Sequence, residues 1–409
     1  VKDCRPEVNC IVHDSDIPFP NYLKDFEFDL IILGPTFLCN RYCTRKLARV
    51  LSDYSFIKES TACKIALPQD DYDCSLILDD WMVKWGVNRV YSVCPKYWDL
   101  LYPKTSKLGQ IKLGYTGYIS NKWIDNWVSP KPFETRKIDV SYRASKLPAN
   151  FGILGQLKSD IADRFCNSIS SITHLNLDIS VDLKDMIPGS KWHYFLENSK
   201  FCISTASGSS LHDPHGIIRS KVRSYVLDNP GVDFHEIESA CFPEQDNHRI
   251  FTALSPRNIE AALAQTVQLA TKGSYSELMK PYEHFIPLAE DCSNIPEVLE
   301  MMEDRPFISN VRNQCKEAIL SEPRLRCHNF VNELISFAED FLSFNHSGTR
   351  VNQDEIDKLF NKYNSWIEKT ETIYWRRRRF KTGIRSLVYK LGGKPIFNLL
   401  FNFLPSRNS

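Results

Sequence analysis

The stretch SPRNIEAALAQTVQLAT, residues 255–271, places a short helix directly before an apolar strand. Ser255 is a favourable N-cap, and Pro256 suits the first helical position, where a backbone N–H is not needed. Asn258 stands three residues after the cap, where a capping box has its reciprocal partner. The apolar residues that follow predict a buried helix face, and residues 266–271 predict a buried strand. A helix followed at once by such a strand is typical of an α/β fold.

The same alternation of strands and helices extends over most of the chain. Before a proline- and charge-rich linker at 128–137, the pattern predicts strands at 28–36, 64–73, 88–94 and 111–119, with helices around Arg45–Leu51 and Cys74–Trp85. After the linker it predicts strands at 138–145, 174–180, 201–207 and 266–271, with a helix around Lys158–Ser168. This spacing indicates parallel sheets. We therefore expect two Rossmann-like α/β domains facing a cleft, with ligands at the carboxyl ends of their strands.

The expected domains are residues 1–130, 138–345 and a helical tail at 346–409. The tail is strongly basic, since residues 372–409 contain nine lysines and arginines and no acid. With a whole-chain charge of +1, residues 1–371 carry about −8. A duplex nucleic-acid binder normally has a basic face on its folded body, so we expect no nucleic-acid partner.

Residues 375–404 predict a basic amphipathic helix followed by phenylalanine- and leucine-rich sequence. Such a helix is typical of proteins that lie on anionic lipid headgroups, so we expect this tail to contact a membrane surface. A helix packed on the body, a helix that binds a partner chain, and an arginine-rich arm for RNA remain alternatives. No run of 18 apolar residues is present, which argues against a spanning helix.

Thirteen cysteines are scattered without CxxC pairs, a pattern that favours free thiols in a reducing cytosol over a zinc site. Together with the basic tail, this predicts a cytoplasmic protein at the inner face of a membrane. We expect no metal and no resident cofactor.

Glu260 and Arg257 are the first candidate binding residues. A carboxylate at the start of a helix can accept two hydrogen bonds from a ribose diol, as acidic residues do in dinucleotide-binding sheets. Arg257 and the helix N-terminus beside Ser255 suit a phosphate. The alternative is a weak surface pair between Arg257 and Glu260, and the residues alone leave both interpretations open.

Two segments upstream offer further polar groups. SGSS (207–210) includes Ser209 and Ser210, and a turn of this kind presents backbone N–H groups to an anion, although an ordinary strand-to-helix turn is the alternative. LHDPHG (211–216) carries two histidines and Asp213. Pro214 and Gly216 interrupt the helix that would align a metal site, so an acid or cation role beside a phosphate is favoured. Arg249, in an otherwise acidic loop, is a candidate for the same cleft.

The N-terminal domain supplies the candidate bases. Asp70 and Asp71 in QDDYD end a predicted strand, where one of them can take a proton from an acceptor hydroxyl or cap the next helix. His13 in HDSD is a weaker candidate. Tyr142 and Arg143 end the first strand of the second domain and can meet a ligand, or Arg143 can pair with a structural acid.

Several segments, taken in order, carry a resemblance to a known family. Residues 255–304 are similar to the donor-binding stretch of GT-B glycosyltransferases, with an S-x-R-x-x-E-A pattern before a strand and a D-x-S-N-x-x-E-V-L helix. Segments at 139–158, 207–216, 234–246 and QDDYD resemble parts of an uncharacterised group of bacterial surface-polysaccharide glycosyltransferases. The resemblance covers about residues 25–340.

The resemblance implies a sugar transferred from a nucleotide sugar to a hydroxyl of a glycan or lipid-linked acceptor, as in lipopolysaccharide or capsule synthesis. Glu260 would hold the ribose, with Arg257 and Ser255 near the phosphates. Thr252 replaces the first glutamate of the pair common in retaining members, and Ala206 stands where the group has an acid. Alternatives are a Kdo-type transferase using a CMP-sugar, a non-catalytic glycan- or nucleotide-binding scaffold, and a metal-dependent hydrolase that uses LHDPH and QDDYD.

Overall fold

Two β-sheets form the framework of the computed structural model, which describes residues 1–127, 130–172, 174–345 and 352–376. The first has the order β1-β2-β3-β4 and comprises Leu30–Leu33, Cys63–Ala66, Arg89–Ser92 and Ile111–Leu113. The second has the order β11-β10-β7-β5-β6 and comprises Ile286–Pro287, Val267–Ala270, Ser199–Ser204, Ile138–Arg143 and Leu177–Ser180. All four pairings within the second sheet are parallel, as are those of β3 with β2 and β4. The predicted fold class of two Rossmann-like α/β sheets is confirmed, while the cleft between them stays a prediction.

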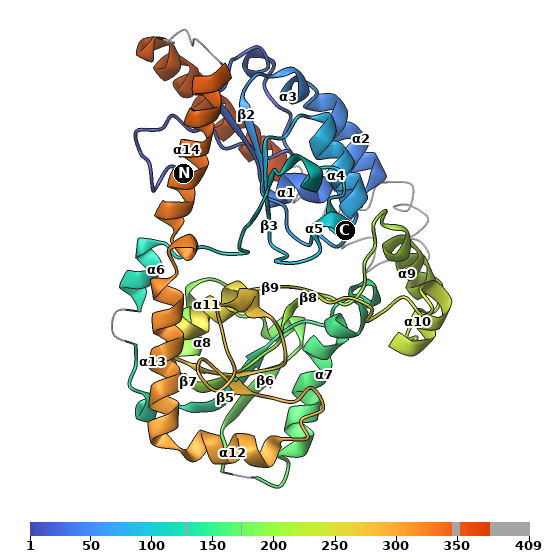
Figure 1. The fold of residues 1–409 in the computed structure, drawn as a ribbon, viewed down its shortest axis with the longest axis vertical. Helices are drawn as coiled ribbons and strands as arrows, with labels where there is room; N and C mark the ends of the chain where they lie inside the picture. The colour runs from blue at the N-terminus through green and yellow to red at the C-terminus, as the bar shows by residue number, and fades with distance from the viewer. Residues whose placement is uncertain (128–129, 173, 346–351, 377–409) are drawn as a thin grey trace. The chain divides into compact units, whose positions relative to one another are not determined.

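The helices lie between the strands in the order that the sequence predicts (Figure 1). Around the first sheet these are α1 (Pro35–Leu38), α2 (Thr44–Asp53), α3 (Phe56–Glu59), α4 (Ser75–Lys84), α5 (Trp98–Leu101) and α6 (Asn121–Asn126). Around the second are α7 (Gly152–Ser168), α8 (Ser190–Glu197), α9 (Ile217–Asp228), α10 (Phe234–Cys241), α11 (Pro256–Leu263), α12 (Ile295–Glu303), α13 (Arg305–Ser321) and α14 (Cys327–Asn345). Helix α7 begins six residues before its predicted start. Gly152 and Gly155 indicate a loop in the sequence, but both lie within the helix.

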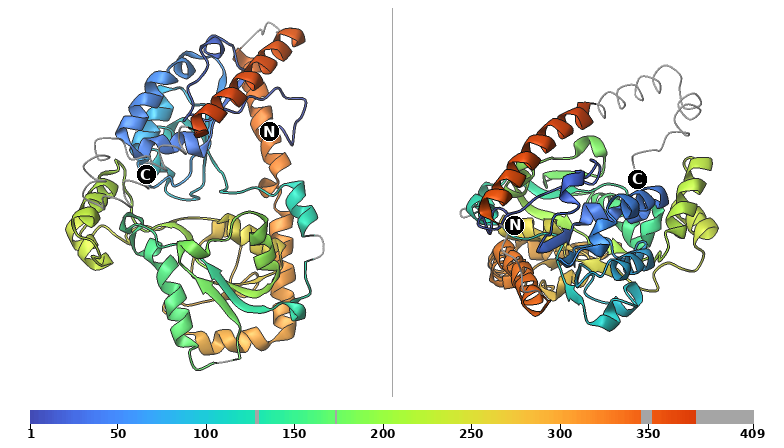
Figure 2. Two further views of the ribbon diagram at one scale, coloured as in Figure 1. Left: turned by 180° about the vertical axis from the view of Figure 1, so that it is seen from behind. Right: turned by 90° about the horizontal axis from the view of Figure 1, so that it is seen from above.

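The five-stranded sheet is covered on both faces (Figures 1 and 2). One core cluster joins β5, β7 and β10 to α7, α12 and the start of α13. A second joins α8, α11 and the end of α13. A two-stranded antiparallel ladder, β8 (Ser207–Ser209) with β9 (Phe251–Ala253), flanks this sheet, and the helices α9 and α10 are inserted between its strands. Every residue of β10 and every residue of β7 except Lys200 is buried, as expected of parallel strands covered on both faces.

Contacts divide the chain into two compact units. One contains Val1–Ile31, Thr36–Cys63 and the described residues after Leu334, and the other contains Ile32–Pro35 and Lys64–Leu334. The domain boundaries expected from the sequence are not tested by this division and stay predictions. Of the predicted basic tail at 375–404, only Trp375 and Arg376 are among the described residues, so the amphipathic helix lies outside them.

In the first unit, the helix at 353–376 is fastened to the N-terminal segment, as the dark orange helix of Figure 2 shows. The Tyr363 hydroxyl donates to the carbonyl oxygen of Val12 at 2.8 Å and lies 3.2 Å from Nδ1 of His13. The other ring nitrogen of His13 lies 3.1 Å from the carbonyl of Ile17. His13 therefore packs within this unit, and its role as a catalytic candidate stays a prediction.

In the second unit, a buried polar network fixes the start of α11. The side-chain amide of Asn258 donates to Oγ of Ser204 at 2.8 Å and to Oε1 of Gln268 at 2.7 Å. Its Oδ1 accepts the backbone N–H of Ser255 at 3.1 Å, which completes the capping box that the sequence predicts. The amide of Gln268 returns a bond to the carbonyl of Asn258 at 3.1 Å. Because these groups pair with one another away from water, they tie α11 to the carboxyl end of β7 and to the first residues of β10.

The far end of α11 is held by Arg136, which is buried. Its guanidinium donates to the carbonyl oxygens of Ala264, Gln265 and Ser199 at 2.8–3.2 Å. Burial lowers the pKa of Arg136 to about 10. Carbonyl oxygens thus compensate a desolvated cation at the turn between α11 and β10.

We predict that Asn258→Ala lowers the free energy of unfolding by about 1–3 kcal/mol, since it removes the bonds donated to Ser204 and Gln268 and the bond accepted from the Ser255 N–H. Urea denaturation of the purified chain measures this. Asn313→Ala is the matched control, because Asn313 makes only an exposed hydrogen bond to Gln265. Equal stability losses in both variants would contradict a special role for the network.

Candidate functional site

Two adjoining cavities open at the carboxyl ends of β5 and β7. The smaller, of about 270 Å³, is called the cationic cavity because Arg143, Lys158 and Arg257 line it, together with Tyr142 and Ser255. The larger, of about 750 Å³, is called the aromatic cavity and is lined by Trp123, Trp192 and His193 beside apolar residues of the loop 182–189. Arg143, Trp192, Ser255 and Arg257 line both. This edge of a parallel sheet is where α/β proteins bind their ligands.

Glu260 lies in the wall of the aromatic cavity, in the second turn of α11. Its Oε2 accepts the indole N–H of Trp192 at 2.7 Å. Burial raises the pKa of Glu260, and the bond from Trp192 and the charge of Arg257 oppose that rise. A carboxylate in such surroundings retains unused acceptor capacity, which vicinal hydroxyls of a sugar can fill.

Arg257 stands between the two cavities. Its guanidinium donates to the backbone carbonyl of Arg143 and lies over the Trp192 ring, 5.4 Å from the centroid. Ser255 accepts the Arg257 N–H as the helix cap, so α11 begins at the same point. The helix N-terminus and the guanidinium together favour an anion there.

Arg143 both lines the cavities and pairs with a structural acid. Its Nη2 binds Oδ1 of Asp178 at 2.6 Å, its Nε donates to the carbonyl of Asp185 at 3.1 Å, and its guanidinium lies 4.7 Å from the Phe195 ring centroid. Tyr142 is buried, and its hydroxyl donates to the Lys158 carbonyl at 2.9 Å. That hydroxyl therefore holds α7, while the ring forms part of the cavity wall.

Lys158 is a site residue that the sequence analysis missed. It lies on α7, and burial with the nearby Arg257 charge lowers its pKa, whereas the charge of Asp70 raises it. Its ammonium is 3.5 Å from the Ser207 hydroxyl. The available signal was its spacing, since Lys158 falls in the middle of the buried stripe formed by Leu154, Ile161 and Ala162. A desolvated ammonium in a cavity is a strong partner for a phosphate.

Ser209 and Ser210 do not form the anion-binding turn that the sequence predicts. SGS is strand β8, paired with residues 251–253, and the N–H of Ser210 donates to the Phe151 carbonyl. The Ser210 hydroxyl accepts the N–H of Leu154, and Asp246 accepts that of Ile153 at 2.6 Å. The Ser210 and Asp246 side chains therefore cap the start of α7, and the Ser210 N–H is bonded within the protein.

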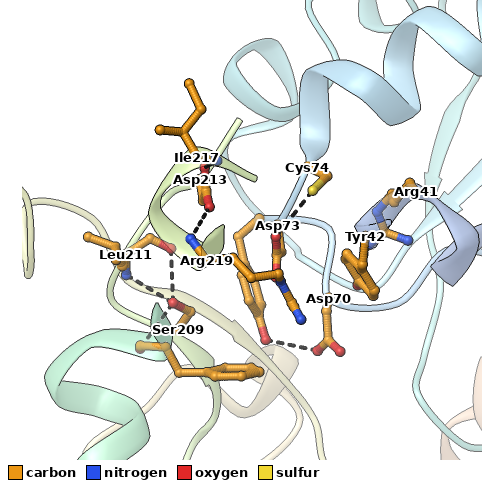
Figure 3. Close-up of polar contacts among 12 residues, drawn as sticks. Arg41, Tyr42, Asp70, Asp73, Cys74, Ser209, Leu211, Asp213, Ile217 and Arg219 are labelled. Carbon is orange, nitrogen blue, oxygen red and sulfur yellow. Dashed lines mark hydrogen bonds and ion pairs between the residues drawn. The ribbon is translucent and has the colours of Figure 1, made fainter. Parts of the chain in front are cut away.

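The three candidate catalytic aspartates differ in accessibility. Asp70 and Asp213 are shown in Figure 3. Asp71 is fully buried and accepts the Ser92 hydroxyl. Asp213 is buried and caps α9, with its carboxylate accepting the N–H groups of Ile217 at 2.9 Å and Arg219 at 2.8 Å. These contacts give Asp71 and Asp213 structural roles, and their role as catalytic residues stays a prediction. Asp70 is exposed after β2, with Oδ1 accepting the Tyr72 hydroxyl at 2.8 Å, and stays the candidate base.

The LHDPH and QDDYD segments do meet, as the hydrolase alternative requires, since the N–H of Asp213 donates to the Tyr72 carbonyl at 3.1 Å. Their side chains are paired with neighbouring residues: Asp73 with Arg219 (Figure 3), and His212, through Nε2, with the Ser75 hydroxyl at 2.8 Å. Burial lowers the pKa of His212 to about 4, so it is neutral near pH 7 and is not the predicted cation. Arg249 is exposed and is not among the described residues that line either cavity.

Metal ligands and membrane-spanning helices both bear on the partners of this chain. Among the described residues, no group of three or more His, Cys, Asp or Glu side chains is arranged to hold a metal ion. Within the same part of the chain, no helix combines the length and the apolar character needed to cross a membrane.

The chain matches no protein-family model, and no curated protein matches it. Among solved structures it is similar to a glycosyltransferase from Rickettsia africae, with 9% identity and a TM-score of 0.40 over 75% of this chain and 82% of that one. It is also similar to TarM, with 10% identity and a TM-score of 0.41 over 80% of this chain and 57% of TarM. A third is HepE from Anabaena in complex with UDP-glucose, with 10% identity and a TM-score of 0.41 over 77% and 78% of the two chains. These identities and TM-scores assign no activity to this chain. A proposal for its function therefore rests on the geometry of its own site.

We predict that Glu260→Gln stabilises the ligand-free protein as pH rises. Because the folded pKa of Glu260 lies above its ordinary 4.5, ionisation costs stability as pH rises from 4.5 through the raised pKa. The glutamine keeps an acceptor for Trp192 without that cost. The gain is about 1.4 kcal/mol for each unit by which the pKa is raised.

Thermal unfolding of both proteins across the acid-to-neutral range measures this difference. The melting temperatures should coincide below pH 4.5 and separate above it, with the variant higher. Glu300→Gln, at an exposed position of α12, is the control and should show no such separation. A Glu260→Gln protein that is less stable at neutral pH contradicts the burial cost.

Proposed function

We propose that this chain is a glycosyltransferase that moves a sugar from a nucleotide-sugar donor to a hydroxyl of a glycan or lipid-linked acceptor. The observation that carries the proposal is the pair of adjoining cavities, one cationic and one aromatic, with Glu260 in the wall of the second. A nucleoside diphosphate has the same division, with a charged diphosphate, a flat base and a ribose diol. The agreement between these parts of the ligand and the cationic and aromatic cavities supports this ligand class.

In the proposed complex, the diphosphate lies in the cationic cavity against Lys158, Arg257 and the N-terminus of α11. The base stacks in the aromatic cavity, and Glu260 accepts the ribose hydroxyls. The donor sugar's C–O bond breaks with its electron pair on the leaving diphosphate, whose charge these cations stabilise. Since fixed cations supply this charge, we expect transfer to need no divalent metal.

Asp70 is proposed as the base that takes the proton from the acceptor hydroxyl. It is exposed at the end of β2, and its charge raises the pKa of Lys158, so the two lie within electrostatic reach. The Tyr72 hydroxyl holds one carboxylate oxygen, which orients the group. We extend the proposal to surface-polysaccharide synthesis at the inner face of a membrane, contacted by the basic residues at 375–404.

We predict that nucleoside diphosphates and their sugars raise the melting temperature and that EDTA leaves the rise unchanged. A ligand at a hundredfold excess over its dissociation constant stabilises a protein by about 2.7 kcal/mol. UDP, GDP, CMP and their sugars are the panel. Glu260→Ala and Lys158→Met should each weaken affinity about tenfold or more, because a charge-assisted bond contributes about 1.5–3 kcal/mol.

Lys146→Met is the matched control, because Lys146 is exposed and is not among the described residues that line either cavity. It should bind as the unaltered chain does. No shift with any nucleotide, or one that appears only with a divalent metal, would sink the proposed site.

We also predict a bell-shaped pH dependence of nucleotide affinity. Affinity should fall on the acid side as Glu260 protonates above its ordinary 4.5, and on the alkaline side as Lys158 loses its proton below its ordinary 10.5. Calorimetric titration with UDP measures both limbs. Lys158→Arg should flatten the alkaline limb, since arginine keeps its charge; an unchanged alkaline limb would remove Lys158 from the site.

A further inference from the structure

Three non-glycine residues in the loops after β2 and β3 adopt the left-handed conformation. They are Asp70 at φ 52°, Cys74 at φ 55° and Tyr97 at φ 68°. A bulky side chain rarely adopts this conformation. Such strained residues persist where their surroundings hold them, and they are concentrated at functional sites. Both loops follow the carboxyl ends of parallel strands, where a ligand is expected.

Tyr97 presents an aromatic ring at this edge. Its side chain is 40% exposed, and within the described residues its hydroxyl makes no hydrogen bond. The ring rests edge-on against the buried Phe251, with centroids 5.4 Å apart. Phe251 packs in turn on Tyr72 at 6.1 Å. The exposed ring therefore has a rigid aromatic support.

The aromatic residues that support Tyr97 also contact Asp70, the candidate base. The Tyr72 ring beside Phe251 carries the hydroxyl that binds Asp70. The contacting rings of Phe251 and Tyr72 thus link the exposed ring of Tyr97 to the exposed carboxylate of Asp70. An anionic ligand would be repelled by that carboxylate, whereas a neutral ligand with hydroxyl groups would be bound by it.

We infer that Tyr97 and Asp70 form the subsite for a neutral pyranose unit of the acceptor. The apolar C–H face of the sugar ring packs on Tyr97, and a ring hydroxyl donates to Asp70. An aromatic surface with one placed polar group is the usual make-up of a small-ligand site. The inference rests on the proposed function and adds to it the residue that recognises the acceptor.

The test is saturation-transfer difference NMR on the full chain without nucleotide. The probes are methyl glucoside, methyl galactoside and methyl mannoside. We expect saturation of the ring C–H protons of at least one of them, reduced several-fold in Tyr97→Leu and retained in Tyr97→Phe. Tyr282→Leu is the matched control, because Tyr282 is also exposed, at 59%, and left-handed, at φ 64°.

Equal signals from Tyr97→Leu and the unaltered chain would overturn the inference, as would the absence of saturation with every glycoside. Melting temperatures of the variants establish that each is folded. Thermal shifts with UDP on the same samples separate the two proposals. A UDP-induced rise in melting temperature without glycoside binding would contradict the acceptor subsite alone. Tyr97-dependent glycoside binding without any rise from UDP would contradict the donor site alone.

Discussion

The positions of Arg257 and Glu260 depend on the buried amide of Asn258. Its bonds to Ser204 and Gln268 join the first turn of α11 to two neighbouring strands, and its Oδ1 closes the cap at Ser255. A helix held only by apolar contacts can shift or rotate by small amounts, because such contacts have no direction. Directed bonds remove that freedom. Arg257, one residue before Asn258, and Glu260, two residues after it, are thereby placed against Trp192 and the end of β5.

The site carries a cost that a ligand would relieve. Burial disfavours the charged forms of both Glu260 and Lys158, and the nearby Arg257 charge further disfavours the ammonium of Lys158. A diphosphate beside Lys158 supplies the missing counter-charge, and sugar hydroxyls supply donors for Glu260. Groups held in an unfavourable state by the fold are typical of binding and catalytic sites. The same reasoning separates Asp70 from Asp71 and Asp213, whose carboxylates are already committed to internal donors.

Local sequence signals were sufficient for the strands and for α11. Strands β5, β7 and β10 each contain short apolar stretches flanked by polar or turn residues, and the Ser-Pro start of α11 is a local capping signal. The role of residues 207–210 was not predictable in the same way. Strand β8 forms because it pairs with β9, more than forty residues away in the sequence. The residues SGSS contain no local signal that predicts this pairing. Lys158 was missed because the predicted helix began too late to reveal its stripe.

The central claim is that a nucleoside diphosphate binds across the two cavities of the second unit. A crystal structure of the chain with bound UDP tests it most directly. The account predicts the diphosphate within hydrogen-bond distance of Lys158 and Arg257, the ribose hydroxyls on Glu260, and the base beside Trp192. UDP bound elsewhere, or bound here with its phosphates away from both cations, would contradict it.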